Sequence, residues 1–213
     1  MVHPNASIAS GTVIGANCQI GAGAVIQAGV VIGESCIVGS NCVLSHCRIG
    51  SDVSIGAGSI IGDSGFGFEM TNTGAIPLPH IGIVRIANGC SIGSHCAIDR
   101  GSLGDTVIGN SVMIDNLCHI AHNVQLGERV IMAGQCGVSG SVTIGSDVQI
   151  GGQVGIAPHL KIGDRAILTA RSGVTKDVVA DCQVAGFPAI NAGQFWRERV
   201  ALRRLAKPSG DEC

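Results

Sequence analysis

Aliphatic residues recur at every sixth position through most of the chain, and small or β-branched residues occupy the fifth position of each six-residue unit. The longest unbroken series spans residues 108–174 and contains twelve units in register. An N-terminal series spans residues 8–61, with one residue dropped between Leu44 and Ile49, and a short third series spans residues 86–98. The chain is therefore built on one hexapeptide period with a few interruptions.

No helix has a period of six, and simple strand alternation places no turn signal at every sixth residue. Glycine often follows the aliphatic residue, as in Ile14-Gly15 and Ile108-Gly109. A hexapeptide repeat predicts a parallel β-helix, in which short strands meet at sharp corners and the aliphatic side chains point to the axis. Three units make a coil of about eighteen residues, so the twenty-five units predict roughly eight coils. We therefore expect residues 1–190 to form an all-β domain, a parallel β-helix.

The cysteines fit the same pattern, because seven of the ten occupy the fifth position of a unit. These seven are Cys18, Cys36, Cys42, Cys90, Cys96, Cys118 and Cys136. Cysteine at such a position packs as a small hydrophobe, so we expect core filling rather than metal binding or redox chemistry. Many free thiols and the lack of a signal-peptide pattern favour a cytoplasmic location.

Two breaks in the period are candidate functional loops. The longer excursion, over residues 63–85, carries two of the four phenylalanines and ends in a Pro77-Leu78-Pro79-His80 segment. The shorter break runs from Asp99 to Val107. Loops on a rigid scaffold commonly carry binding functions, although a cap or packing flap is an equal alternative here.

After Val174 the period fades, and residues 191–207 show a rough helical stripe that Pro208 ends, leaving 208–213 as a tail. This predicted α-helix holds five of the thirteen basic residues of an acidic chain. They are Arg197, Arg199, Arg203, Arg204 and Lys207. So basic an end favours an acidic partner or a phosphate, with a solvated helix face as the alternative.

Composition excludes two classes of function. A net charge of −2 and an aromatic content of 2% provide neither a basic field nor stacking platforms for nucleic acid. No apolar run approaches the roughly 18 residues that a membrane-spanning helix needs. We therefore expect neither a nucleic-acid partner nor a membrane span.

Among the seven histidines, His122 and His159 stand out by position. Their units begin 36 residues apart, which is two coils, so the axial gap between them is about 10 Å. Gly140 follows His122 by one coil and should lie between the two histidines. A base at His122, an oxyanion contact at the Gly140 N–H and a second contact at His159 would suit acyl chemistry. Exposed corner histidines, or a zinc site with His119, are the alternatives.

Several longer motifs carry a family resemblance: DSGFGF over 63–68, IDRGSLGDTVIG over 98–109, IDN over 114–116, IAHNV over 120–124, and GGQV over 151–154 followed by His159. On these motifs the chain, over about residues 4–205, resembles the UDP-3-O-acylglucosamine N-acyltransferase family of lipid A biosynthesis. That family belongs to the hexapeptide-repeat acyltransferases. The resemblance implies a left-handed parallel β-helix and a homotrimer with active sites between subunits.

The implied reaction is transfer of a 3-hydroxyacyl group from acyl carrier protein to the 2-amine of a UDP-3-O-acyl-glucosamine. No bound cofactor is implied, because the acyl group arrives on the phosphopantetheine arm of the carrier protein. By resemblance, His122 is the general base, Gly140 supplies the backbone oxyanion donor and His159 is a second active-site histidine. The nucleotide-sugar acceptor and the carrier protein are the implied partners.

The resemblance also assigns binding roles. Asp115 and Asn116 match polar residues of the cleft, and Gly173 and Thr175 lie where the acyl groove is expected. The basic helix, with Arg197, Arg203 and Arg204, matches the region that meets the carrier protein. A substitution of Gly173 by Met is expected to shorten the preferred acyl chain.

The chain departs from the family pattern in two ways. The sequence starts within the first coil, so we expect either a fragment or a natural short form without the family's N-terminal uridine-binding domain. In addition, His80 and His119 stand where glutamine is expected in many relatives. An acyl- or acetyl-coenzyme A-dependent transferase acting on a sugar amine is the alternative function. A non-enzymatic assembly or a zinc-dependent hydratase of the same fold is a more distant alternative.

Overall fold

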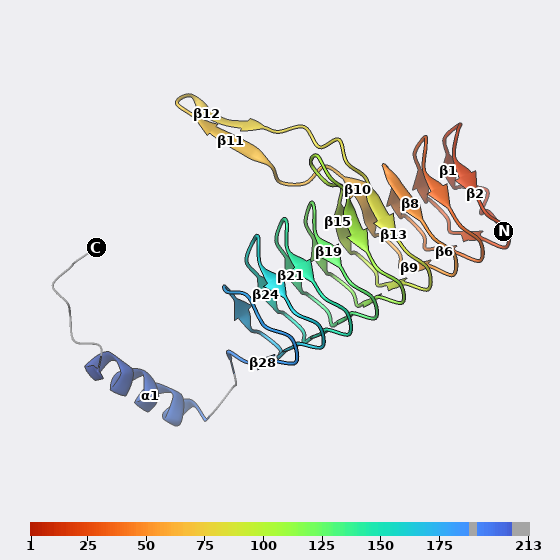
Figure 1. Cartoon of the computed structure of the whole chain (residues 1–213). Coiled ribbons are helices and arrows are strands. Elements are labelled where there is room, and N and C mark those ends of the chain that lie inside the picture. Colours follow the sequence, from red (N-terminus) through yellow and green to blue (C-terminus); the bar gives the residue numbers. More distant parts are fainter. Residues whose placement is uncertain (188–190, 206–213) are drawn as a thin grey trace.

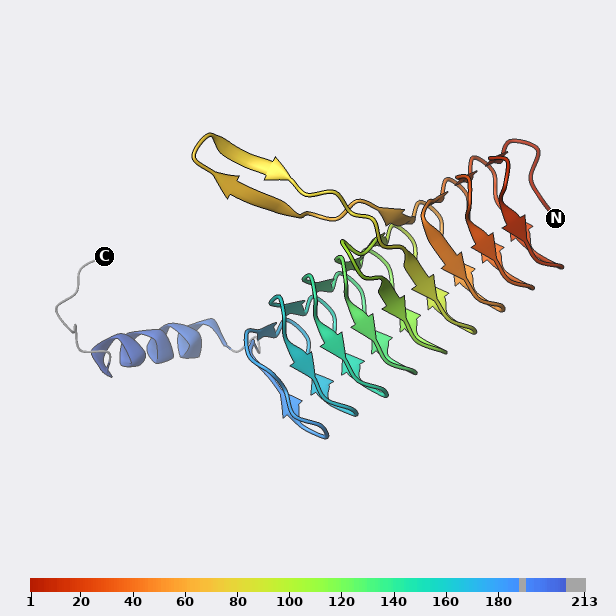
Figure 2. The ribbon, with the colours of Figure 1, turned by 45° about the horizontal axis from the view of Figure 1, so that its top comes forward.

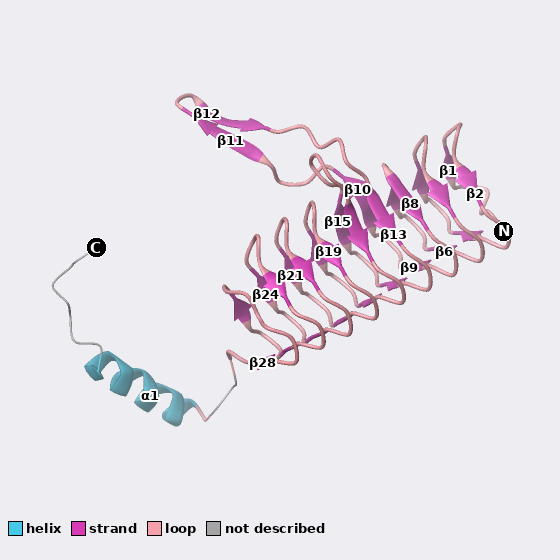
Figure 3. Cartoon of the chain, in the orientation of Figure 1, coloured by secondary structure: helices cyan, strands magenta, loops and turns pink. Residues whose placement is uncertain are grey.

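The computed structural model of the chain describes residues 1–187 and 191–205. Residues 1–187 wind into a parallel β-helix whose coils stack along one axis, with the N-terminus at one end of the stack (Figures 1 and 2). Nearly every coil contributes one short strand to each of three sheets, which form the faces of the β-helix (Figure 3). The all-β, parallel β-helical fold expected from the six-residue period is confirmed.

The three faces hold nine, eight and nine strands. Face 1 consists of β1 (Ser7–Ile8), β4 (Val25–Ile26), β7 (Val43–Leu44), β10 (Ile60–Asp63), β15 (Ala97–Asp99), β18 (His119–Ile120), β21 (Gly137–Val138), β24 (Gly155–Ile156) and β27 (Gly173–Val174). Face 2 consists of β2 (Val13–Ile14), β5 (Val31–Ile32), β8 (Cys47–Ile49), β13 (Val84–Ile86), β16 (Thr106–Ile108), β19 (Gln125–Leu126), β22 (Thr143–Ile144) and β25 (Lys161–Ile162). Face 3 consists of β3 (Gln19–Ile20), β6 (Ile37–Val38), β9 (Ser54–Ile55), β14 (Ser91–Ile92), β17 (Met113–Ile114), β20 (Ile131–Met132), β23 (Gln149–Ile150), β26 (Ile167–Leu168) and β28 (Gln183–Val184). The stack is slightly longer than roughly eight coils, because β28 extends it beyond the last unit of the repeat.

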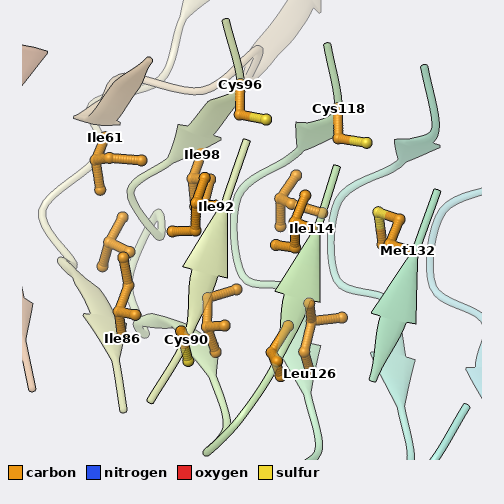
Figure 4. Packing of buried hydrophobic residues seen from close by; sticks show 14 of the residues in the cluster. Ile61, Ile86, Cys90, Ile92, Cys96, Ile98, Ile114, Cys118, Leu126 and Met132 are labelled. Atoms are coloured by element: carbon orange, nitrogen blue, oxygen red, sulfur yellow. The ribbon is translucent and has the colours of Figure 1, made fainter. Parts of the chain in front are cut away.

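The period of six follows from this geometry. Most units have a two- or three-residue strand, whose aliphatic residue points inward, and a corner that turns the chain to the next face. Along face 3, Ile92 pairs with Ile114 and Ile114 with Met132, so equivalent side chains stack in columns inside the β-helix (Figure 4). Many corner residues other than glycine have positive φ, such as Asn123 at 61°. Asparagine and aspartate tolerate that region better than β-branched residues do.

All seven fifth-position cysteines are buried, with exposed fractions of 4% or less, which confirms their expected place in the core. Several thiols donate to a carbonyl of the next coil, as Cys136 does to Gly151 at 3.0 Å. Cys47 is buried as well, and burial raises the pKa of its thiol to about 12. These thiols act as small core side chains.

Between β10 and β13 the chain leaves the coils to form an antiparallel hairpin of β11 (Phe68–Thr71) and β12 (Gly74–Pro77). The hairpin projects from the β-helix and leans along it toward the C-terminal coils (Figures 1 and 2). A second, shorter loop separates β15 from β16. The two loops bond to each other: Ile81 N–H donates to Ser102 O at 2.7 Å and Arg100 Nε–H to Gly82 O at 2.6 Å.

The helix α1 (Ala192–Leu205) follows the last coil, and Asn191 caps its N-terminus by accepting the Gly193 N–H at 3.0 Å. It has no buried residue. The predicted domain end at 188–190, the last two residues of the predicted helix and the tail 208–213 lie outside the described residues. No helix in the described ranges is long and apolar enough to cross a membrane.

Candidate active site

His122, Gly140 and His159 lie along one corner of the β-helix, between faces 1 and 2, on three successive coils. The backbone ties them together, because His159 N–H donates to Gly140 O at 3.1 Å and Ser141 N–H donates to His122 O at 3.0 Å. The three residues thus lie together as their spacing in the sequence predicts, and their chemical roles stay predictions.

The imidazole of His122 lies directly against the backbone of Gly140. A Cβ atom at position 140 would stand 2.7 Å from both Cε1 and Nε2 of His122, closer than any non-bonded carbon contact permits. Only glycine therefore allows the ring to occupy this place. The N–H of Gly140 has no hydrogen-bond partner among the described residues. A reacting oxygen that approached Nε2 of His122 would meet this free donor nearby.

Asn123 determines which nitrogen of the His122 ring carries the proton. Its Oδ1 accepts the Ser102 N–H at 3.0 Å and its Nδ2 donates to Gly104 O at 3.1 Å, which fixes the orientation of the amide. His122 Nδ1 lies 3.0 Å from the same Oδ1, an acceptor, so Nδ1 must be the protonated nitrogen. Nε2 then keeps its lone pair and faces the Gly140 side of the cleft.

The excursion covers the other side of His122. The ring of His80 packs edge-to-face on the His122 ring, with centroids 5.1 Å apart and an interplanar angle of 72°. His80 is only 6% exposed, and its Nδ1 donates to Leu78 O at 3.1 Å. Its Nε2 is buried without a hydrogen-bond partner in the described part of the chain. A Cβ at Gly65 would touch both histidine rings, so this loop also closes tightly over them.

A cleft of about 650 Å³ opens beside His122. Its floor is formed by Gly137, Gly155 and Gly173, which pair in register on β21, β24 and β27. A Cβ at any of the three would meet nothing within 4 Å, so the floor is open along three coils. Phe66 from the excursion overhangs the cleft, and Thr175 lies at its far end. The predicted acyl-groove residues, Gly173 and Thr175, thus line the same cavity as His122.

His119 occupies the position before the three glycines in the same column of face 1. Its Nε2 lies 3.7 Å from Asp99 Oδ2, and its side chain is half exposed in the cleft. Burial raises the pKa of the Asp99 carboxyl, and the nearby histidines His119 and His122 oppose that rise. No group of three or more His, Cys, Asp or Glu side chains in the described ranges is arranged to hold a metal ion.

Asp115 and Asn116 lie at a different corner, between faces 3 and 1, and do not line the cleft of His122 in the same chain. They bond to each other, with Asn116 Nδ2 donating to Asp115 Oδ1 at 2.8 Å. Asp115 borders a shallow hollow with Met113 and Ile131, whose side chains are half exposed on face 3. Within one chain the structure does not bring these two polar residues to His122.

The basic residues Arg197, Arg203 and Arg204 are exposed on α1, with Arg203 and Arg204 in its last turn.

Three residues that surround His122 in the structure had no contact with His122 predicted from the sequence. Asn123 directly follows His122, which was a usable signal. Ser102 and His80 come from the two loops, and only the folded chain shows that these loops converge on one histidine.

Comparison with known proteins finds one matching family model and several similar curated proteins. The family model "bacterial transferase hexapeptide (six repeats)" matches residues 1–28, 11–46, 29–63 and 105–140. A UDP-3-O-acylglucosamine N-acyltransferase of Maricaulis maris (strain MCS10) is 53% identical over 150 residues, covering 70% of this chain and 44% of that protein. The protein of the same name from Granulibacter bethesdensis (strain ATCC BAA-1260 / CGDNIH1) is 48% identical over 147 residues, covering 69% and 43%. The chain thus spans less than half the length of these curated relatives.

Two solved structures share the fold. A UDP-N-acetylglucosamine acyltransferase from Campylobacter jejuni superposes with a TM-score of 0.80 at 23% identity, over 99% of this chain and 86% of that one. The Francisella novicida UDP-N-acetylglucosamine acyltransferase gives a TM-score of 0.78 at 24% identity, over 93% and 73%. At this level of identity the likeness concerns the fold alone.

Proposed function

This chain belongs to the bacterial hexapeptide-repeat transferases, and on that premise we propose that it is an N-acyltransferase of lipid A biosynthesis. The reaction is transfer of a 3-hydroxyacyl group from acyl carrier protein to the 2-amine of a UDP-3-O-acyl-glucosamine. The names of its curated relatives support the acceptor class, and the cleft beside His122 supports the chemistry.

The geometry of His122 is the observation that best supports the proposed N-acyl transfer. Its Nδ1–H is held by Asn123 Oδ1 at 3.0 Å, which leaves the lone pair of Nε2 available beside an open cleft. A general base needs that arrangement: one ring nitrogen fixed by a partner, and the other free to take a proton. Exposed corner histidines without a partner would not be oriented in this way.

In the proposed step the acceptor amine attacks the thioester carbon while Nε2 of His122 removes a proton from nitrogen. The negative charge that develops on the carbonyl oxygen is met by the free N–H of Gly140. Collapse of the tetrahedral intermediate forms the amide and breaks the C–S bond. The imidazolium returns the proton to the departing thiolate of phosphopantetheine.

The acyl chain would lie on the glycine floor of the cleft. Three coils span about 10 Å between the outer strands, and a floor without side chains admits an extended hydrocarbon. Thr175 and the position of Gly173 would define the far end of the chain. His159 is exposed in the wall of this cleft and supports a second polar contact to substrate.

We propose that the active form is a homotrimer. The outer side of face 3 carries apolar side chains that one chain leaves uncovered: Ile37, Met113, Ile131 and Ile167 are 36–53% exposed. Burial of this stripe against another subunit would remove it from water. It would also bring Asp115 and Asn116, which border the stripe, to a subunit boundary, where they could reach a neighbour's cleft.

The acidic carrier protein would meet α1. Arg197, Arg203 and Arg204 are exposed there, and cationic side chains favour an acidic partner through long-range attraction. Mutation of such charges is expected to raise the KM for the carrier-bound donor, with a strong dependence on salt.

The test is a mass-spectrometric transfer assay on the purified chain with UDP-3-O-(3-hydroxyacyl)-glucosamine. The donor is either 3-hydroxyacyl carrier protein or 3-hydroxyacyl coenzyme A. We expect N-acylation from the carrier protein, lost by at least a hundredfold in His122→Ala and retained in His95→Asn, which alters an exposed histidine at another corner. Transfer from coenzyme A alone would favour the alternative donor class. Full activity of His122→Ala would refute the proposed base.

A further inference from the structure

Ser102, in the short loop between β15 and β16, makes two hydrogen bonds to the residue that holds His122. Its N–H donates to Asn123 Oδ1 at 3.0 Å, and its Oγ–H donates to the same oxygen at 2.6 Å. His122 Nδ1–H is the third donor to that atom, at 3.0 Å. One amide oxygen therefore collects three donors, two of them from Ser102.

We propose that Ser102 is a positioning residue for His122, acting through Asn123 to hold the base in its Nδ1–H form. This inference rests on the proposed function, because it takes His122 as the base. Ser102 does not line the cleft, so its effect passes through the amide rather than through substrate.

The hydrogen bonds leave the Asn123 amide one orientation. Its Oδ1 accepts three donors, and its Nδ2 donates to Gly104 O at 3.1 Å. A flip of the amide would place its NH₂ group against those three donors, so Oδ1 stays toward His122 Nδ1.

Ser102 also couples His122 to the excursion. Its carbonyl accepts the Ile81 N–H at 2.7 Å, next in sequence to the His80 that packs on the His122 ring. The loop around Ser102 is held closed by Gly101, where any Cβ would collide with the Gly104 carbonyl. A displacement of the excursion would therefore move Ser102, and with it the amide that holds the proton.

The test compares Ser102→Ala with Ser102→Thr, which keeps the hydroxyl, and with Ser146→Ala as a matched half-buried serine at the corner between faces 2 and 3. In Ser102→Ala we expect kcat to fall about fivefold, as the loss of one hydrogen bond allows, with the KM of both substrates unchanged within twofold. Ser102→Thr should restore kcat.

A second readout does not depend on activity. Histidine ¹⁵N NMR of the full chain is expected to show His122 in the Nδ1–H form, and a mixture of tautomers in Ser102→Ala. If Ser102→Ala does not fold, Asn123→Asp, which supplies a stronger acceptor, should keep the Nδ1–H form. A His122 tautomer and a kcat in Ser102→Ala identical to those of Ser146→Ala would overturn the inference. If the transfer assay fails with every donor, the NMR result still decides whether Ser102 sets the tautomer.

Discussion

The backbone of Gly140 lies against the ring of His122, where a Cβ atom would stand 2.7 Å from Nε2. The relationship joins two coils at a single corner of the β-helix. It brings a ring nitrogen with a free lone pair close to a backbone N–H that has no hydrogen-bond partner in the described part of the chain. It arises from elementary constraints: identical coils stack in register, and only glycine gives the ring room to lie over the next corner.

Gly140→Ala should displace the imidazole and lower kcat about a hundredfold, because a misplacement of about 1 Å at a catalytic group costs that much. Gly186→Ala is the matched control, since a Cβ there meets nothing within 4 Å and the position lies outside the cleft. Steady-state transfer rates of both variants, with thermal unfolding to confirm folding, provide the measurement. Equal activity of the two would show that the tight contact has no part in the reaction.

Gly173→Met should shift the preferred donor to shorter acyl chains. The position has open space above it on the floor of the cleft, so the new side chain can fill the far end without disturbing the fold. Competition among carrier proteins loaded with different chain lengths, read by product mass, measures the preference. Gly186→Met, also at an open position but outside the cleft, serves as control. An unchanged preference in Gly173→Met would place the acyl chain elsewhere.

His80→Ala should lower kcat about tenfold, because loss of the edge-to-face contact releases the His122 ring from its fixed orientation. Aromatic pairs of this kind contribute about 0.5–1.5 kcal/mol, which corresponds to a factor of roughly ten at most. His80→Gln can still donate to the Leu78 carbonyl and fills similar space, so we expect it to retain most of the activity. Two variants with equally normal kcat would mean that Asn123 alone orients the base.

Asp99→Asn should stabilise the chain near neutral pH. Burial raises the pKa of Asp99 above its unfolded value, so the folded chain binds this proton more tightly than the unfolded chain does. The stabilisation from the protonated carboxyl is complete below the unfolded pKa and is lost as the pH rises through the folded pKa. Asparagine is neutral throughout, so its advantage over Asp99 should be present at pH 7 and shrink toward pH 4.

Urea unfolding at several pH values measures the difference in the free energy of unfolding between Asp99→Asn and the parent chain. Asp181→Asn is a control in which the effect on stability has the opposite sign. The hydrogen bond from Arg165 lowers the pKa of Asp181, so loss of this bond in Asp181→Asn should destabilise the chain at pH 7 and should destabilise it less as the pH falls. A pH-independent difference between Asp99→Asn and the parent chain would contradict the assignment.

The coils were predictable because one constraint repeats in every unit. A residue such as Ile120 must point inward and the next corner must turn, so the period of six alone predicts the stack, the buried cysteines and the alignment of His122 with Gly140. The hairpin of β11 and β12 was not predictable from the period, since its residues lie outside the repeat.

The surroundings of His122 could be predicted only in part. Asn123 is adjacent in sequence, but Ser102 and His80 reach the base through loops whose paths depend on tertiary hydrogen bonds, such as Ile81 to Ser102. Asp115 and Asn116 illustrate the opposite case. They lie one strand earlier in the sequence, yet the turn between faces places them at another corner of the same chain.

The glycine floor can lengthen or shorten by two independent routes. An inserted coil beyond β24 would extend it by one strand spacing, about 4.8 Å, and leave His122 and Gly140 untouched. A side chain at position 173 would instead shorten the floor by less than one strand spacing. The length of the cleft can therefore change in coarse steps by duplication of eighteen codons and in fine steps by point mutation, while His122 and Gly140 stay as they are.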